Sequence, residues 1–428
     1  MTDLTSIDYK DIYVTDEAAE AQPARYASAV KSFLEIFGGT EEDIRIFSAP
    51  GRSEIGGNHT DHQNGQVLAA SVNRDAIAIT RKTCGNVIRV HAEGFDPVDV
   101  RTDDLASRKE ERGSTAALIR GVLYSLCSGR DYELGGFDAY ITSDVLIGAG
   151  LSSSAAFETL IGTIVSGLYN GMKIDPVTVA IAGQEAENEF FGKPCGLMDQ
   201  MASSVGGMVF IDFKDPKAPV VRQIEFDLDE VGYALCITDT KGSHADLTSD
   251  YAAIPEEMTK IAKLLGQDKL RGITINDIIG NMDTLRAEAG DRAVLRAIHF
   301  TQENERAALE ADALERGDIS SFIALVRKSG DSSYKYLQNV YSDSKTKIQN
   351  VSVALALSDL ILGDDEAARV HGGGFAGTIQ AFVRKENKNR YKELMDKVFG
   401  QGSCEIMSIR RYGGIESTPE GIRVCPAK

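Results

Sequence analysis

The chain has 428 residues, of which 43% are hydrophobic and 26% are charged, and its formal net charge is −18. This length exceeds the roughly 250–300 residues at which one core stops growing, so it predicts two domains. The composition excludes a membrane-spanning protein, because no apolar run approaches about 18 residues, and the acidic balance disfavours nucleic acids and anionic membranes as partners.

The N-terminal segment and the cysteines predict a cytoplasmic protein. Residues 1–22 are polar and acidic, without the basic start and apolar stretch of a secretory signal peptide, so we expect a polar N-terminal extension there. The six cysteines form no CxxC pair, which indicates reduced thiols rather than a disulfide framework or a zinc site.

Helices and strands mix through the first half of the chain. Apolar side chains recur at helical spacing over residues 24–38, and a polar glycine-rich loop follows over residues 50–65. Alternating β-branched runs and longer apolar periodic runs come after this loop. They predict strands at 76–82, 86–94 and 135–144 and helices at 114–129 and 151–171.

A charged, proline-bearing connection near residue 215 predicts a domain boundary. It would divide an N-terminal domain over 23–215 from a C-terminal domain over 216–428. The second half is predicted to hold strands at 233–240, 378–384 and 404–411, a helix-rich stretch over 251–362 and a helix over 387–400.

The loop over residues 50–65, PGRSEIGGNHTDHQNG, is the first candidate site. Its glycines let the backbone approach a ligand closely, while Arg52, Asn58, His59 and Asp61 offer hydrogen-bond donors and acceptors suited to a polyhydroxylated molecule. Taken alone, the same composition is also typical of a polar surface turn.

A second cluster, VLIGAGLSSSAAFETL over residues 145–160, places glycines before serines that begin a helix. Backbone N–H groups at a helix start bind anions, and phosphate is the natural guest, although the loop lacks the GK[ST] of a Walker A motif. A capped buried helix is the alternative interpretation. A third cluster, VHGGGFAGTIQAFV over residues 370–383, is either a tight turn or a close approach to a ligand.

The fourth cluster, QEAENEFFGKPCGLMDQ over residues 184–200, carries two candidate carboxylates. Glu187 lies on a predicted helix and Asp199 follows a PCG turn, so both could face one cleft. Separately, each could equally be a solvated residue on a helix surface.

Together and in this order, the four clusters resemble the galactokinase branch of the GHMP kinase superfamily. GRxxxxGxHTDxxxG is similar to its sugar signature, GAGLSSSAA to its phosphate loop, and AExxFxGxPCGxMDQ to the stretch with its catalytic aspartate. HGGGFAG resembles its third glycine motif. The resemblance implies a two-domain α+β fold, with a ribosomal-protein-S5-like N-terminal domain and a ferredoxin-like C-terminal domain.

The resemblance also implies a role for each matching residue. Asp199 would be the base or hydrogen-bond acceptor at the anomeric hydroxyl of the sugar, and Arg52 would stabilise the charge around it. The implied sugar contacts are Asn58, His59, Asp61, Gly196 and Tyr251, the implied ATP contacts are Gly148, Gly150, Ser152, Ser153 and Ser154, and the implied Mg²⁺ ligands are Ser154 and Glu187.

The sequence departs from the family pattern mainly at the sugar end. Asn58 stands where galactokinases usually carry a Glu that they use on the hydroxymethyl end of galactose, and its neutral amide removes a charge that would repel a C6 carboxylate. Ser53 and Glu54 replace the usual Val-Asn pair, His62 replaces a common Tyr, and AAIPEEM replaces an Arg-rich run after Tyr251.

These features predict an ATP- and Mg²⁺-dependent kinase acting on the anomeric hydroxyl of galactose. Galacturonate, N-acetylgalactosamine or arabinose stays open as the substrate, as does a non-catalytic sugar and ATP sensor, although the complete GLSSSAA disfavours the sensor. The expected partners are the sugar and ATP only, with no nucleic acid or membrane, and the expected state is a monomer or weak homo-oligomer.

Overall fold

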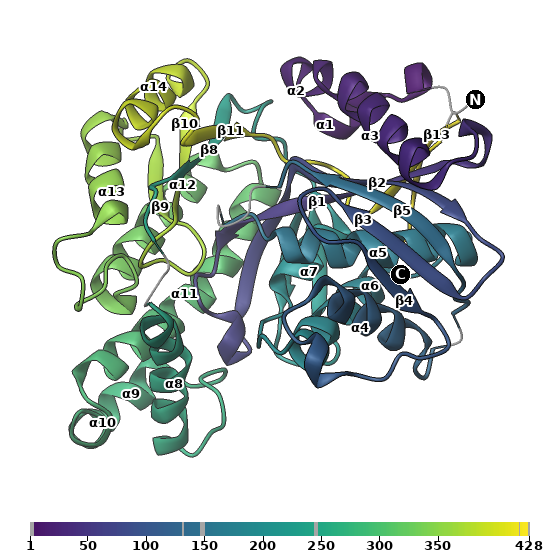
Figure 1. The fold of residues 1–428 in the computed structure, drawn as a ribbon. Helices are drawn as coiled ribbons and strands as arrows, with labels where there is room; N and C mark the ends of the chain where they lie inside the picture. Colours follow the sequence, from purple (N-terminus) through teal and green to yellow (C-terminus); the bar gives the residue numbers. More distant parts are fainter. Residues whose placement is uncertain (1–3, 131, 146–149, 244–246, 419, 427–428) are drawn as a thin grey trace.

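Within the residues that the structure describes, the strands form one nine-stranded and one four-stranded sheet (Figure 1). The structure is a computed structural model that describes residues 4–130, 132–145, 150–243, 247–418 and 420–426. Its mixture of helices and mainly antiparallel strands confirms the predicted α+β class.

The large sheet has the order β13-β12-β1-β2-β5-β3-β4, and β6 and β7 extend it from the N-terminal part of β2. Its strands are β1 (Arg45–Gly56), β2 (Gln66–Lys82), β3 (Val87–Ala92), β4 (Val98–Arg101), β5 (Phe137–Ser143), β6 (Met208–Asp212), β7 (Val220–Ile224), β12 (Ile415–Thr418) and β13 (Gly421–Val424). The small sheet has the order β11-β8-β10-β9, with β8 (Tyr233–Asp239), β9 (Ala367–Val370), β10 (Thr378–Arg384) and β11 (Cys404–Met407).

Helices cover both faces of the large sheet (Figure 1). On one face are α1 (Tyr9–Tyr13), α2 (Asp16–Glu20) and α3 (Gln22–Phe37), and on the other are α4 (Thr115–Cys127), α5 (Ser153–Asn170), α6 (Pro176–Glu185) and α7 (Met198–Val205). Apolar residues of α4, α5 and α6 pack with β-strand residues such as Phe47 and Phe137 into one core cluster. This layering confirms the helices predicted at 24–38, 114–129 and 151–171.

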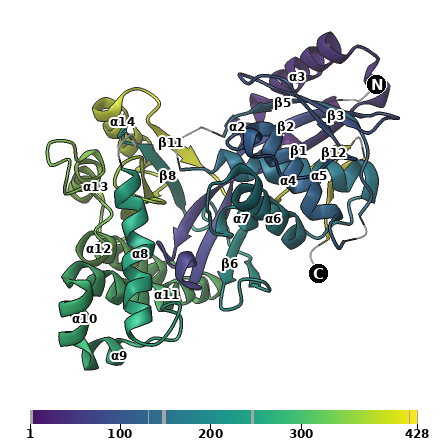
Figure 2. The same cartoon turned by 60° about the horizontal axis from the view of Figure 1, so that its bottom comes forward.

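The second half is rich in helices, as the sequence predicts. These helices are α8 (Thr248–Leu264), α9 (Ile275–Gly280), α10 (Met282–Ala289), α11 (Asp291–Glu315), α12 (Ile319–Ser332), α13 (Asn350–Ile361) and α14 (Lys388–Phe399). The turned view in Figure 2 shows the ends of β1 and β2 reaching toward α11, so strands of the first half contact helices of the second. None of the described helices is both long and apolar enough to cross a membrane.

The N-terminal segment is not a polar extension where the structure describes it. Ile12 and Tyr13 of α1 are fully buried and pack with Tyr26, Phe33 and strand residues in one core cluster. This packing was not predictable from the sequence, because α1 and α2 have five residues each and are too short to show an apolar periodicity.

The loop predicted over residues 50–65 also needs correction, because β1 continues through its first half to Gly56. The pairing of β1 with β2 shifts register between Pro50 and Arg52 and again between Glu54 and Gly56. Such bulges re-aim side chains, and here they accompany the proline and glycines that suggested a loop. Arg52 is therefore held on a strand.

The boundary predicted near residue 215 falls in the connection between β6 and β7, which pair with each other. At the other end of the chain, β12 pairs with β1 and β13 with β12. The division into two domains stays a prediction, and any such division must assign the last two strands to the sheet of the first half.

Candidate active site

Arg52 and Asp199 form the centre of the candidate site. Arg52 is buried on β1, and Asp199 lies in the first turn of α7. The guanidinium Nε is 2.7 Å from Asp199 Oδ1 and Nη2 is 2.6 Å from Oδ2, which is the two-point geometry that arginine prefers with carboxylates. Arg52 Nη1 also donates to the Gly150 carbonyl. The sugar and phosphate clusters of the sequence therefore meet at one arginine.

The electrostatic environment keeps Asp199 ionised. Burial alone would raise the pKa of this carboxyl, but the charge of Arg52 and hydrogen bonds from Arg52 and Ser152 outweigh it and hold the pKa below the ordinary value. Ser152 Oγ donates to Asp199 Oδ2 at 2.5 Å. A carboxylate held in this way orients a hydroxyl well and is a weak base.

The phosphate cluster lies at the start of α5. Ser152 adopts a left-handed conformation (φ 56°) just before the helix, and Ser153 and Ser154 form its first turn. The first backbone N–H groups of a helix have no intrahelical partners, so this end can receive an anion. Because Ser152 contacts Asp199, an anion bound there would lie beside the carboxylate. The predicted phosphate contact at Gly148 falls outside the described residues.

Gly150 sits where a side chain has no room. Its φ is +70°, and an added Cβ would lie 2.7 Å from Thr378 Oγ1 and 2.9 Å from His371 Nδ1. The third glycine motif therefore packs directly against the phosphate cluster. His371 is neutral in this position, because burial and then the nearby charges of Arg52 and Arg369 lower its pKa to about 3.

Glu187 lies in a π-helical turn over Ala186–Phe191 and is buried. Its Oε1 contacts Lys193 Nζ at 3.3 Å, and its Oε2 accepts from Gln200 Nε2 at 3.1 Å. The same amide donates to Glu158 Oε2 at 3.0 Å, while Glu158 Oε1 is buried without a partner. Burial and the charge of Glu187 raise the pKa of Glu158 well above its ordinary value. Two neighbouring buried carboxyl groups, one with an unpartnered oxygen, are a donor set that a cation would stabilise.

Asp61 and Gly196 lie against each other. An added Cβ on Gly196 would lie 2.1 Å from Asp61 Oδ2. Gly196 lies three residues before Asp199, just ahead of α7, and the Asp61 charge acts on Arg52. The structure therefore brings Asp61, Gly196, Arg52 and Asp199 into one region.

His59 and Tyr251 both contact the third glycine motif. His59 has a left-handed backbone (φ 58°), and its Nε2 lies 3.1 Å from the Gly373 carbonyl. Burial and the neighbouring His62 lower the pKa of His59 to about 4, although this hydrogen bond opposes them. Tyr251 Oη donates to the Gly374 carbonyl at 2.8 Å.

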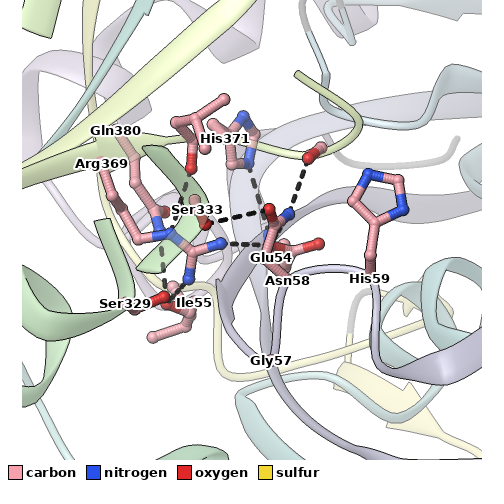
Figure 3. A network of polar contacts seen from close by, with 12 residues as sticks. Glu54, Ile55, Gly57, Asn58, His59, Ser329, Ser333, Arg369, His371 and Gln380 are labelled. Carbon is pink, nitrogen blue, oxygen red and sulfur yellow. Dashed lines mark hydrogen bonds and ion pairs between the residues drawn. The ribbon is translucent and has the colours of Figure 1, made fainter. Parts of the chain in front are cut away.

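Asn58 is placed differently from the other predicted sugar contacts. It is fully buried, and its amide makes hydrogen bonds with the protein through both nitrogen and oxygen (Figure 3). One of its partners is Glu54, whose Oε1 accepts from Asn58 Nδ2 at 2.9 Å. In the view of Figure 3 the His59 ring points away from this network.

Comparison with known proteins assigns the chain to a family. The galactokinase galactose-binding signature matches residues 31–82, and the GHMP kinases N terminal domain matches residues 117–207. A galactokinase from Streptomyces coelicolor is 32% identical over 372 residues, which cover 86% of this chain and 91% of the relative. The chain belongs to the galactokinase family.

Solved structures show the same GHMP kinase fold that the motifs implied. A Lactococcus lactis galactokinase complexed with galactose superposes with a TM-score of 0.77 at 22% identity, covering 91% of this chain and 99% of that one. A mevalonate kinase from Methanococcus jannaschii has a TM-score of 0.60 at 15% identity, covering 87% and 99%. At these identities the likeness establishes the fold.

The structure brings residues of the four sequence clusters together, but sequence reasoning gave no role to three buried residues among them. His371 was quoted within HGGGFAG without a role, yet its Nε2 is 3.1 Å from Ser53 Oγ and receives the Glu54 N–H at 3.3 Å. Arg369 forms an ion pair with Glu54. The signal for Glu54 was present, because a carboxylate inside a buried strand needs a cation. The position of that cation in the sequence was not predictable.

Proposed function

We propose that this chain transfers the γ-phosphoryl group of ATP to the anomeric hydroxyl of galactose, giving galactose 1-phosphate and ADP. The observation that carries the proposal is the Arg52–Asp199 pair, which lies between the start of α5 and the Asp61–Gly196 contact. One side of the pair suits a phosphate chain and the other a polyhydroxylated ligand.

Phosphoryl transfer needs little covalent work from the protein and much positioning of charge. Asp199 would accept a hydrogen bond from the attacking hydroxyl, orient it, and take its proton late, because the lowered pKa makes this carboxylate a weak base. Arg52 would stabilise the negative charge that spreads over the transferring group.

The start of α5 would hold the phosphates of ATP. Gly150 and the hydroxyls and N–H groups of Ser152, Ser153 and Ser154 are the proposed contacts, together with Gly148. Ser154 and Glu187 would hold Mg²⁺, which would supply positive charge to neutralise the phosphates. The Glu187 carboxylate and the unpartnered Glu158 oxygen beside it are donors of the kind that this ion prefers.

The proposed sugar contacts are His59, Asp61, Gly196 and Tyr251. An Asp carboxylate accepts two hydroxyls readily, and a glycine beside it exposes its backbone to the ligand. His59 stays neutral at physiological pH, so it can both donate and accept.

The argument for a uronic acid substrate loses its basis. It rested on the missing negative charge at Asn58, but the Glu54 carboxylate lies 2.9 Å from the Asn58 amide. That carboxylate is paired with the buried Arg369, so it adds no net charge that would repel a C6 carboxylate. The Asn58 amide is bound to protein groups through both nitrogen and oxygen, so the charge at position 58 gives no evidence for a uronic acid.

ADP release with a panel of free sugars tests the function directly. The panel should hold galactose, galacturonate, N-acetylgalactosamine and arabinose, and we expect the highest kcat/KM with galactose. Asp199→Asn should lower kcat by about 10²–10⁴-fold. Asp138→Asn is the matched control, because the Asp138 carboxylate on β5 also accepts two hydrogen bonds from one arginine, Arg89 on β3, at 2.7 and 2.9 Å. The proposal would be refuted if the wild-type protein phosphorylated the other sugars of the panel but not galactose.

Two further expectations complete the proposed function. A cytoplasmic location is expected because the proposed phosphoryl donor, ATP, is abundant there. The monomeric or weakly oligomeric state stays a prediction from the sequence.

A further inference from the structure

Glu54 and Asn58 carry the residue types of the family pattern in exchanged positions. The family usually has Asn at the first position and Glu at the second, whereas this chain has Glu54 and Asn58. The two side chains contact each other, with Asn58 Nδ2 donating to Glu54 Oε1 at 2.9 Å. Their exposed fractions are 4% and 0%. One carboxylate and one amide are thus conserved as a pair although each has changed position.

The hydrogen-bonding capacity of the Asn58 side chain is fully used inside the protein. An amide offers two N–H donors and two acceptor lone pairs. Its Nδ2 donates to Glu54 and, at 2.8 Å, to the Gly372 carbonyl. Its Oδ1 accepts from Asn339 Nδ2 at 2.9 Å and from Ser333 Oγ at 3.3 Å (Figure 3). A sugar hydroxyl could bind this side chain only by displacing one of these partners.

The Glu54 carboxylate is held through one of its oxygens. Its Oε1, which also accepts from Asn58, forms an ion pair with Arg369, which is fully buried on β9. Arg369 also donates from Nη1 to the Ile55 carbonyl at 2.9 Å, so one cation holds both the side chain and the backbone of β1. Replacing Glu54 with a neutral residue would remove the direct ion pair of this buried cation and leave it only the more distant charge of Glu303.

The main-chain N–H groups beside the pair are held by α11. Glu303 Oε1 accepts from the N–H groups of Gly57 and Asn58, both at 3.3 Å, and from Ser329 Oγ at 2.6 Å. The backbone of this turn is therefore fixed on one side by α11 and on the other by the pair. His59, the next residue, leaves the turn in its left-handed conformation.

The contacts of the pair end on the third glycine motif, which also receives His59. Asn58 reaches Gly372, and His59 Nε2 lies 3.1 Å from the Gly373 carbonyl. Asn339 donates to that same carbonyl at 3.3 Å. The Asn58 amide and the His59 ring thus bind successive glycines, so the first contact fixes where the second can form.

We propose that Glu54 and Asn58 are a positioning pair. The pair holds the turn before His59 against Arg369 and the third glycine motif, and residue 58 makes no contact with the sugar. His59 and Asp61 then recognise the sugar in its place. The proposal rests on the proposed sugar kinase function for its kinetic test, whereas its stability test needs no substrate.

The stability test is a double-mutant cycle on the melting temperature. Glu54→Asn leaves Arg369 unpaired and Asn58→Glu places a second carboxylate beside Glu54, so each should lower the Tm. The double variant Glu54→Asn with Asn58→Glu restores one carboxylate and one amide, and its Tm should exceed that of either single variant. If the Tm losses of the two single variants simply added in the double variant, residues 54 and 58 would not be coupled, and the positioning pair would be refuted.

The kinetic test compares galactose with 6-deoxygalactose, which lacks the C6 hydroxyl. The variants are Asn58→Ala and Asn339→Ala, of which the second removes a partner of Asn58 from outside the turn. For both, we expect kcat/KM to fall by the same factor with either sugar, about tenfold through the sugar KM, while the ATP KM stays unchanged. Asn170→Ala is the matched control, since Asn170 donates to the Glu133 carbonyl at 3.0 Å at the end of α5 opposite to the phosphate cluster, and it should match wild type.

The alternative predicts a different pattern. If Asn58 bound the C6 hydroxyl, Asn58→Ala would reduce kcat/KM for galactose and leave kcat/KM for 6-deoxygalactose unaffected. Asn339→Ala would then not change the ratio of kcat/KM between the two sugars. That result would overturn the proposal. If the wild-type chain phosphorylated neither sugar, the proposed function would fail, and the melting-temperature cycle would still decide whether the two residues are coupled.

Discussion

The carboxylate of Asp61 occupies the space that any side chain at position 196 would need. An added Cβ on Gly196 would lie 2.1 Å from Asp61 Oδ2, far inside contact distance. Because Gly196 precedes Asp199 closely in the chain, the position of Asp61 is coupled to that of the catalytic segment. The absence of a side chain at Gly196 therefore lets Asp61, a proposed sugar contact, lie close to the segment that carries Asp199.

Gly196→Ala should displace Asp61 and weaken sugar binding. We expect the galactose KM to rise by about tenfold or more, because a charged hydrogen bond to the sugar would be lost or lengthened. The ATP KM should change little. Gly280→Ala is the matched control, since an added Cβ there meets nothing within 4 Å and should leave both constants unchanged. An unchanged galactose KM in Gly196→Ala would contradict the placement of Asp61.

Arg52→Lys should preserve the positive charge and lose most of the activity. Lysine is a point charge that cannot bind both carboxylate oxygens in the planar two-point geometry or also reach the Gly150 carbonyl. We expect kcat at saturating substrates to fall by about 10²–10³-fold, as when one donor to a transition-state charge is removed.

The control for this variant lies on the same strand. Arg45 begins β1 and pairs with Glu416 at 2.5 Å, outside the site. Arg45→Lys should keep kcat within about twofold of wild type. A small loss in Arg52→Lys, comparable to that of Arg45→Lys, would show that charge alone suffices and that the two-point contact has no catalytic value.

Local sequence pattern was enough to single out the proposed catalytic pair and the proposed phosphate cluster. Arg52, Ser152 and Asp199 stand in short segments with an unusual density of glycines and polar residues, and the order of these segments matches the family. The structure then joins them directly, through contacts across 147 and 47 residues of chain. Chemistry that is concentrated in short motifs is legible from one sequence.

The buried partners of the site could not be predicted in the same way. Arg369 pairs with Glu54 across 315 residues, and nothing near either residue indicates the other. The course of β1 through the glycine-rich segment depends on its pairing with β2 and β12, which is a long-range property. Local composition therefore indicated the proposed ligand contacts and did not indicate the buried residues that hold them in place.

Tyr13→Phe should reveal that the N-terminal segment belongs to the core. Tyr13 Oη donates to Asp75 Oδ2 at 2.7 Å and lies 3.0 Å from Tyr26 Oη, and all three residues are fully buried. Removing this hydroxyl should lower the free energy of unfolding in urea by about 1–3 kcal/mol. Tyr412→Phe is the control, because its hydroxyl donates to Asp11 at the surface, and its effect should stay within about 0.5 kcal/mol.

The buried histidines should make stability depend on pH above the range where carboxylates titrate. The pKa of His371 is lowered to about 3 and that of His59 to about 4, in both cases first by burial. In the unfolded chain a histidine has a pKa of about 6.5. Between these values the unfolded state binds more protons than the folded state, so stability is fully present above about pH 6.5 and falls as the pH is lowered.

Thermal unfolding of wild type and His371→Gln between pH 5.5 and 7 measures this dependence. Each such histidine contributes up to about 1.4 kcal/mol per pH unit, so the variant should show a shallower slope whatever its stability at pH 7. Thr378→Val is the control, because it removes the Nδ1 partner at 2.9 Å and keeps the ring. Its slope should equal that of wild type even if its Tm is lower. Equal slopes for all three proteins would show that folding does not lower the pKa of His371. The neutral state assigned to His371 between Gly150 and β1 would then be wrong.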